Sequence, residues 1–289
     1  MAANRLRVQE QPTLTDGRMI LAFSGWMDGG DVSTGTVEWL TKMLDARAVA
    51  RIAPEDFYIY NFPGTMELCD VLRPHAKVED GLVTAFDPPA NVFSCAGESR
   101  LVLFSGREPN FAWDDFADCL FDFAARSSVT TMYFVGSFGG TVPHTRDPRL
   151  FASVSEEGLK PALAEFGLRF ANYEGPASLA TQLIHQAHRR GVRMASLVAE
   201  IPAYIQGPNP KCIEAVVRKL AAILGLQLPL GDLRHLGPAW EERLTKVLAK
   251  KTDLAKYIRK LEEDYDNEVF DTQMGDLKEW LEQQGIRVD

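Results

Sequence analysis

The chain has 289 residues, of which 46% are hydrophobic, enough for one large α/β domain or two small ones around a substantial core. Its 31 basic and 40 acidic residues give a formal net charge of -9, which repels nucleic-acid phosphates and anionic lipids. We therefore expect neither nucleic acid nor a membrane as a partner.

The cysteines also argue against a metal site. Cys69, Cys95, Cys119 and Cys212 are widely separated, and none forms the C-x-x-C pair that grips zinc or runs redox chemistry. Buried free thiols without a metal or other cofactor are expected. The first residues carry no apolar signal-peptide core, and no apolar run approaches the roughly 18 residues needed to span a bilayer. These features predict a cytoplasmic protein.

Strand-like and helix-like segments alternate from residue 18 to residue 225. The apolar runs that predict strands are 18–25, 49–54, 57–62, 100–106, 130–137 and 193–202. Segments with helical spacing of apolar residues lie between them, at 30–44, 111–126, 155–166, 177–190 and 210–225. This alternation predicts an α/β fold with helices on both faces of a mainly parallel sheet, a three-layer α/β/α sandwich.

Residues 62–98 interrupt the alternation. They are rich in proline and glycine, and the runs LVTAF and NVFSC on either side of DPPA predict a β-hairpin. Because hairpin strands are antiparallel, we expect a mixed sheet.

From about residue 229 the sequence becomes more highly charged and loses its strand-like runs. Its apolar residues recur at helical spacing, namely Trp240, Leu244, Val247, Leu248, Leu254, Tyr257, Ile258, Leu261 and Tyr265. We predict an α/β core domain over 1–228 and a helical C-terminal extension over 229–289. The extension is expected to pack on the core or on a neighbouring subunit.

A glycine-rich turn, FSGWMDGGDVSTG, joins the first predicted strand to the first helix. It matches neither the Walker loop nor the dinucleotide fingerprint, but free N–H groups at a helix N-terminus can bind an anion or a carbonyl oxygen. The alternative is that Gly25, Gly29 and Gly30 only allow the turn and close packing. Trp26 and Asp28 favour a binding site.

Two further segments follow predicted strands. In VGSFGG, Val135 replaces the first glycine of the nucleophile elbow, so Ser137 is not expected to be a nucleophile. In SGREPNFAWDDF, Arg107, Glu108 and Asn110 precede a helix. The core side of that helix is predicted to contain Phe111, Trp113, Phe116, Leu120 and Phe123, and its acidic stripe Asp114, Asp118 and Asp122 to be either solvated or a partner surface.

The densest polar segment is TVPHTRDPRL, residues 141–150. His144 can move a proton, and the planar fork of Arg146 can bind a carboxylate or phosphate in a bidentate manner. The alternative is a loop that internal arginine–aspartate pairs hold in place. Because the strands before Asp28, Glu108 and Ser137 are predicted to be parallel, these residues should lie at one edge of the sheet.

Five motifs, in order, give the chain a resemblance to a known family. They are the glycine loop at 25–30, E-P-N-x-x-W at 108–113, P-H-T-R at 143–146, Y-x-G-P at 173–176 and P-x-Y at 202–204. Over residues 10–230 the chain resembles the bacterial branch of the proteasome-assembly-chaperone-2 family. The resemblance implies a phosphorylase/hydrolase-like sandwich and homo-oligomers, often trimers. It implies no established reaction, although eukaryotic relatives help to assemble the proteasome α-ring.

Two functions are compatible with these observations. The first is a non-enzymatic binding or assembly protein, chaperone-like and homo-oligomeric, whose partner is itself, another protein or a small anionic ligand. The second is a nucleoside-phosphorylase or hydrolase-type enzyme, with one pocket lined by the 25–30 and 143–146 loops. We favour the first, because no nucleophile or metal set is evident. The candidate binding residues are Gly25, Trp26, Asp28, Gly29, Gly30, Glu108, Asn110, His144, Thr145, Arg146, Tyr173 and Tyr204.

Overall fold

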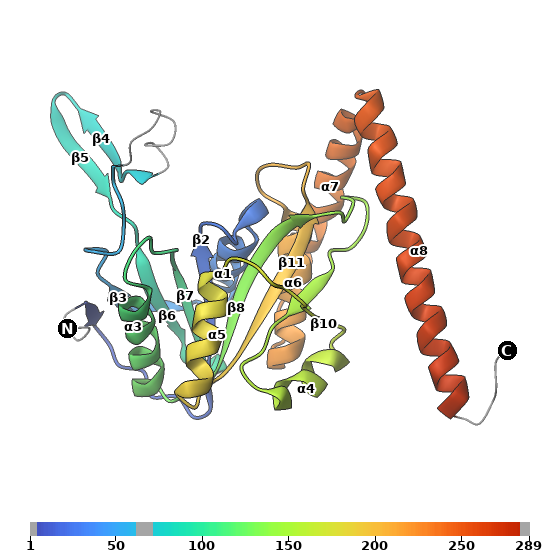
Figure 1. Cartoon of the computed structure of the whole chain (residues 1–289). Helices are drawn as coiled ribbons and strands as arrows, with labels where there is room; N and C mark the ends of the chain where they lie inside the picture. The colour runs from blue at the N-terminus through green and yellow to red at the C-terminus, as the bar shows by residue number, and fades with distance from the viewer. Residues whose placement is uncertain (1–4, 62–71, 284–289) are drawn as a thin grey trace.

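A mixed β-sheet forms the centre of the molecule. The structure, a computed structural model, describes residues 5–61 and 72–283 (Figure 1). Within these residues the sheet has nine strands, in the order β1 (Leu6–Val8), β3 (Arg47–Ile52), β6 (Asn91–Ala96), β7 (Leu101–Arg107), β2 (Gly17–Ser24), β8 (Val129–Gly140), β11 (Arg193–Pro202), β9 (Leu150–Ala152) and β10 (Arg169–Phe170). Strands β7, β2, β8 and β11 are parallel, whereas β6 and β9 are antiparallel to their central neighbours.

Helices cover both faces of the sheet, as the alternation of elements predicts. Strand β2 is buried on both sides: Met19 and Leu21 pack into one hydrophobic cluster, and Ile20 and Ala22 into another. The first cluster includes residues of α3 (Trp113–Arg126) and α5 (Leu179–Arg189), and the second those of α1 (Val32–Met43) and α6 (Pro210–Leu224). Figure 1 shows α3 and α5 in front of the sheet. The fold is therefore a three-layer α/β/α sandwich.

The segment predicted as helix 155–166 is shorter than expected. This segment contains the 3₁₀ turn η4 (Glu157–Leu159) followed by α4 (Lys160–Glu165). Elsewhere in the described residues, the 3₁₀ turns η2 (Gly29–Asp31) and η3 (Gly97–Ser99) lie in loops. Of the residues predicted for the core side of α3, Phe116, Leu120 and Phe123 are buried. Phe111 is 54% exposed, because it precedes the helix and does not share its periodicity.

The acidic stripe of α3 makes contacts within the chain. Asp114 accepts hydrogen bonds from Gln182 and Gln186 of α5 at 2.8 and 2.7 Å. Asp118 pairs with Arg190, just after α5. Asp114 and Asp118 thus connect α3 to α5, while Asp122 pairs with Arg126 of α3 itself. The side chains of Asp118 and Asp122 stay partly solvated, as one of the two expectations had it.

One strand prediction and one strand-pairing prediction between residues 57 and 98 are wrong. Within the described residues 57–61 no strand forms, because the carbonyl of Phe57 accepts hydrogen bonds from the N–H groups of Asn110 and Phe111 in another loop. The run LVTAF pairs with the preceding strand, not with NVFSC: β5 (Leu82–Asp87) and β4 (His75–Glu79) form a separate arm. Strand β6 joins the main sheet because Phe93 is fully buried there, whereas side chains of the arm are mostly exposed.

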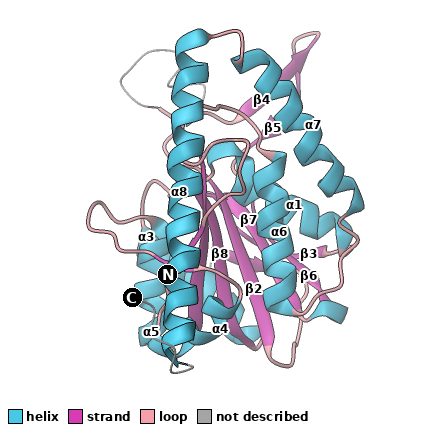
Figure 2. Ribbon diagram, turned by 90° about the vertical axis from the view of Figure 1, so that its right-hand side faces the viewer, coloured by secondary structure: helices cyan, strands magenta, loops and turns pink. Residues whose placement is uncertain are grey.

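The C-terminal extension is helical, as predicted. It consists of α7 (Gly231–Leu248) and the long α8 (Thr252–Gln283), seen side-on in Figure 2. Its apolar stripe is only partly buried: Trp240, Leu248, Ile258 and Leu261 are at most 9% exposed. Val247 and Tyr257 are 53% and 49% exposed.

Two features of the described residues bear on cysteines and membranes. Cys119 and Cys212 are buried free thiols and Cys95 is half-buried, while Cys69 lies outside the described residues. None of the described helices combines the length and apolar character needed to cross a membrane.

Candidate functional site

The loops after β2, β7 and β8 meet at the carboxyl end of the parallel strands, which confirms that these loops share one edge of the sheet. Asp28 pairs with Ser137 in an isolated parallel bridge. The N–H of Glu108 donates to the carbonyl of Ser24 at 2.9 Å, and the Glu108 carboxylate accepts from the N–H of Trp26 at 3.0 Å. Glu108 therefore fixes the glycine loop to the β7 end.

Asp28 uses its carboxylate to cap α1. It accepts hydrogen bonds from the N–H groups of Ser33 and Thr34 at 2.8 and 3.0 Å and from the Thr34 hydroxyl at 2.7 Å. Desolvation by burial raises the pKa of Asp28, although these hydrogen bonds act in the opposite direction. The free N–H groups that an external anion could use at this helix N-terminus are thus partly taken by the protein's own carboxylate.

Gly30 is required by its backbone conformation and by close packing. Gly30 has a φ of +67°, and a Cβ there would lie 2.9 Å from the Cβ of Asn209. The carbonyl of Gly29 accepts from the Ser137 hydroxyl at 2.6 Å, while the N–H of Ser137 donates to Met27 at 2.8 Å. Ser137 therefore connects β8 to the glycine loop through both its hydroxyl and its backbone N–H, which is a structural role.

A hollow of about 360 Å³ opens beside the glycine loop. Its lining consists of Ser24, Gly25, Trp26, Arg107, Glu108, Pro109, Asn110 and Trp113. The Trp26 side chain is 65% exposed at this hollow, and the neighbouring Phe111 is 54% exposed. Asn110 points its side-chain oxygen toward the N–H of Ile59, at 3.0 Å.

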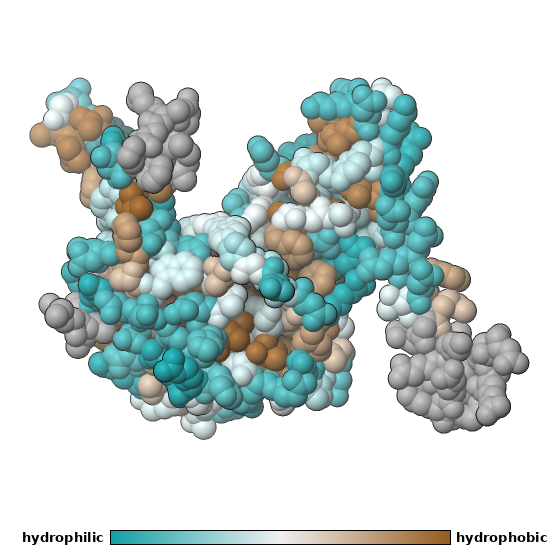
Figure 3. All heavy atoms as spheres, viewed as in Figure 1, coloured by the Kyte–Doolittle hydropathy of each residue, from teal (hydrophilic) through white to brown (hydrophobic). Residues whose placement is uncertain are grey.

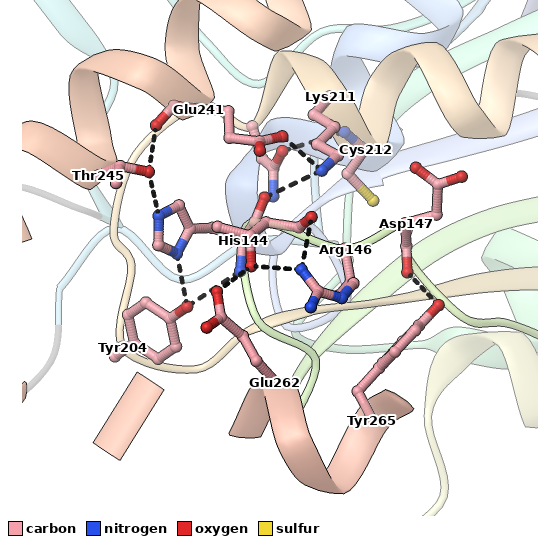
Figure 4. Close-up of polar contacts among 12 residues, drawn as sticks. His144, Arg146, Asp147, Tyr204, Lys211, Cys212, Glu241, Thr245, Glu262 and Tyr265 are labelled. Atoms are coloured by element: carbon pink, nitrogen blue, oxygen red, sulfur yellow. Dashed lines mark hydrogen bonds and ion pairs between the residues drawn. The ribbon is translucent and has the colours of Figure 1, made fainter. Parts of the chain in front are cut away.

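His144 is at the centre of a second cluster of polar residues, shown in Figure 4. It is 3% exposed, its Nδ1 lies 2.8 Å from the Tyr204 hydroxyl, and its Nε2 lies 3.0 Å from the Thr245 hydroxyl on α7. The backbone N–H of His144 also donates to Tyr204, at 3.0 Å. Burial lowers the pKa of His144 and raises that of Tyr204 to about 12. Both groups are therefore neutral near pH 7 and act as interior bridges.

Arg146 and Thr145 connect this cluster to α8. The guanidinium of Arg146 donates two hydrogen bonds of 2.7 Å to the Asp266 carboxylate, the bidentate geometry expected for an external ligand. The Thr145 hydroxyl donates to Glu262 at 2.5 Å. An arginine–aspartate pair does hold the loop, but it is not internal to the loop as expected, because the aspartate comes from the C-terminal extension.

Three charged residues of this region were not among the binding residues predicted from the sequence. Glu200, at the end of β11, is 5% exposed and accepts from the N–H groups of Thr141 and Val142 at 2.6 and 3.1 Å. Arg149 pairs with Glu200 at 3.0 Å, and Lys211 donates to the carbonyl of His144 at 3.0 Å. Glu200 is the one acidic residue in the apolar run MASLVAEIP. Because a buried charge needs partners, this position could have indicated from the sequence that Glu200 pairs with polar groups nearby.

The polar loops line two different hollows. The one beside His144 and Arg146 has a volume of about 10 Å³, room for roughly one water molecule, and its lining has no residue in common with that of the hollow at Trp26. Tyr204 belongs to the His144 cluster. Tyr173 joins neither: it is 69% exposed and its hydroxyl donates to the carbonyl of Pro176 in its own loop.

Comparison with known proteins identifies the family. The model of the PAC2 family matches residues 22–248. The chain belongs to the PAC2 family. No curated protein matches the sequence of this PAC2 protein.

Several solved structures resemble this PAC2 protein. A proteasome-assembly chaperone homologue from Mycobacterium tuberculosis is 29% identical, with a TM-score of 0.73 over 83% of this chain and 99% of that one. A PAC2 family protein from Streptomyces avermitilis is 28% identical, with a TM-score of 0.70 over 84% and 99%. An archaeal proteasome activator from Pyrococcus furiosus, 21% identical with a TM-score of 0.63 over 84% and 97%, shares the fold.

The motifs that carried the resemblance have structural roles in this PAC2 protein. The glycine loop caps α1 through Asp28, and Glu108 ties that loop to β7. The P-H-T-R segment seats the C-terminal helices through His144 and Arg146. These motifs hold the loops at the strand ends in fixed positions, leaving Trp26 exposed among them.

Proposed function

We propose that this PAC2 protein is a non-enzymatic, chaperone-like assembly protein of the cytoplasm that forms a homo-oligomer and binds another protein through the surface around Trp26 and Phe111. The observation that carries the proposal is the exposure of these two aromatic side chains, 65% and 54%, beside the hollow at the strand ends. Exposed aromatic residues next to a concave surface are typical anchors of protein interfaces.

The side chains that could take part in catalysis are already hydrogen-bonded within the chain, which supports a binding function over an enzymatic one. His144 is bonded at both ring nitrogens, Arg146 is bound by Asp266, and Asp28 accepts three hydrogen bonds from α1. A general base must reach the proton that it removes, and the space beside His144 holds roughly one water molecule. No specific feature of the described residues favours the enzymatic alternative.

The relative from Mycobacterium tuberculosis suggests the first partner to test, because it is described as a proteasome-assembly chaperone homologue. The experiment is co-expression of the intact chain with proteasome α- and β-subunits from the same organism, followed by native mass measurement of the complexes. The proposal predicts a complex that contains this chain and α-subunits. It also predicts that Trp26→Ala with Phe111→Ala abolishes the complex while thermal stability is unchanged.

Met43→Ala serves as the matched control, since Met43 is an exposed apolar residue at the end of α1, whereas the glycine loop lies at its beginning. The control variant should bind as well as the unmodified chain. If no subunit associates with the intact chain, the assembly role is contradicted. Equal loss of binding in the control would contradict the assignment of the surface.

A further inference from the structure

Three arginines form a cationic surface on a chain whose net charge is -9. Arg146 and Arg149 come from the segment after β8, and Arg169 is the first residue of β10. All three are covered by carboxylates of α8: Asp266 binds Arg146, and Glu268 binds both Arg149 and Arg169. We call these three arginines, together with Thr145, the arginine seat.

One arginine of the seat, Arg149, is held by the core independently of α8. Glu200 at the end of β11 holds Arg149, and the N–H groups of Thr141 and Val142 hold Glu200 in turn. The Arg149 side chain is 8% exposed, and its Nε has no hydrogen-bond partner among the described residues. The charge and donors of Arg149 are thus positioned in advance for an acidic ligand.

The contacts between α8 and the seat are largely polar, and the acidic side chains that make them are partly exposed to solvent. The side chains of Asp266 and Glu268 are 54% and 44% exposed, so water and salt weaken their pairs with the arginines. Buried apolar anchors of α8 lie near its start, at Ile258 and Leu261. Figure 3 shows a mainly hydrophilic surface over the visible side of this helix.

The acidic groups of α8 are arranged as a recognition element. Glu262 and Asp266 are one helical turn apart, and they meet Thr145 and Arg146. Tyr265, between them, lies under the Arg149 guanidinium at 4.4 Å from the ring centroid and donates to the carbonyl of Asp147 at 3.1 Å. A helix that presents acidic side chains one turn apart beside an aromatic ring therefore matches the seat.

We propose that the arginine seat is a binding site for an acidic helical segment of a partner protein, and that α8 occupies it within the chain as a displaceable mimic. Only residues 249–251 connect α7 to α8, so rotation there can lift α8 away, with the loss of the buried contacts of Ile258 and Leu261, while α7 stays packed on the core. The seat is separate from the Trp26 surface, so the two proposals can fail independently.

The probe is a fluorescein-labelled synthetic peptide of residues 252–272, added to the full chain while fluorescence anisotropy is measured. The double variant Asp266→Asn with Glu268→Gln weakens the competing α8 and keeps the seat intact. It should bind the peptide about tenfold more tightly than the unmodified chain does, because intramolecular competition is reduced. Adding Arg146→Glu to the double variant should abolish this binding.

Two controls separate the seat from general charge effects. Arg126→Glu, added to the double variant, changes an arginine on α3 that pairs with Asp122, and it should leave peptide binding unchanged. A peptide in which Glu262, Asp266 and Glu268 are replaced by their amides should not bind. Absence of peptide binding to a folded double variant, or binding that Arg146→Glu leaves intact, overturns the proposal.

Discussion

At the scale of single residues, Asp28 acts as a helix cap. Its carboxylate accepts three hydrogen bonds from Ser33 and Thr34, at the start of α1. Replacement by alanine leaves those donors without a partner, so Asp28→Ala should lower the free energy of unfolding by about 1–2 kcal/mol. Urea denaturation measures this, with Glu38→Ala on the exposed side of α1 as the matched control. Unchanged stability of Asp28→Ala would contradict the capping role.

His144 gives the protein a specific dependence on pH. Burial lowers the pKa of His144 in the folded state below its ordinary value of about 6.5, outweighing the opposite influence of Glu241 and Glu262. Because the unfolded chain then binds the proton more readily, the stabilisation is complete above about pH 6.5 and is lost as pH falls through the lower folded-state pKa.

The check is the melting temperature of the protein and of His144→Gln between pH 7.5 and pH 5. The unmodified protein should lose more stability on acidification than the variant, which lacks the titrating ring. Other groups titrate in both proteins, so the difference between the two curves isolates His144. Parallel curves would contradict the prediction.

At the scale of elements, two residues of α7 that the sequence places on one apolar stripe differ in burial. Trp240 is 9% exposed and lines a small cavity together with Lys211 and Cys212 of α6, whereas Val247 is 53% exposed. Removing the indole leaves a cavity, so Trp240→Ala should lower the free energy of unfolding by about 3 kcal/mol. Val247→Ala should change it by less than about 0.5 kcal/mol, as surface substitutions do. Guanidinium denaturation of both variants decides; equal effects would mean that α7 does not pack as described.

At the scale of the whole molecule, the unburied part of the stripe bears on self-association. Trp240, Ile258 and Leu261 are buried within the chain, while Val247 and Phe270 are exposed. If another subunit covers these two, the intact chain should be an oligomer by light scattering at about 10 µM, and the family resemblance suggests a trimer. Val247→Glu with Phe270→Glu should then reduce the mass to that of a monomer. A monomeric intact chain would exclude this assembly.

The layer architecture is determined by the sequence itself. Buried central strands such as β2 are apolar on both sides, and helices such as α3 repeat their apolar residues every three to four positions, so local periodicity identifies both. The shared edge of Asp28, Glu108 and Ser137 follows from the same information, since parallel strands place their carboxyl ends together. Short motifs in a fixed order also sufficed to indicate the family.

Tertiary structure decided which partners these residues meet. The runs at β5 and β6 look alike in sequence, yet only β6 has a neighbour on each side in the main sheet, and such pairing depends on distant strands. Arg146 meets Asp266, 120 positions away, and Glu200 meets Arg149 across two strand ends. Local periodicity carries no information about contacts across such separations, because loop closure and packing of the whole chain select them. The sequence therefore predicted that the loops of Asp28, Glu108 and Ser137 share one edge of the sheet. Only the folded chain showed that Arg146 binds the protein's own C-terminal helix.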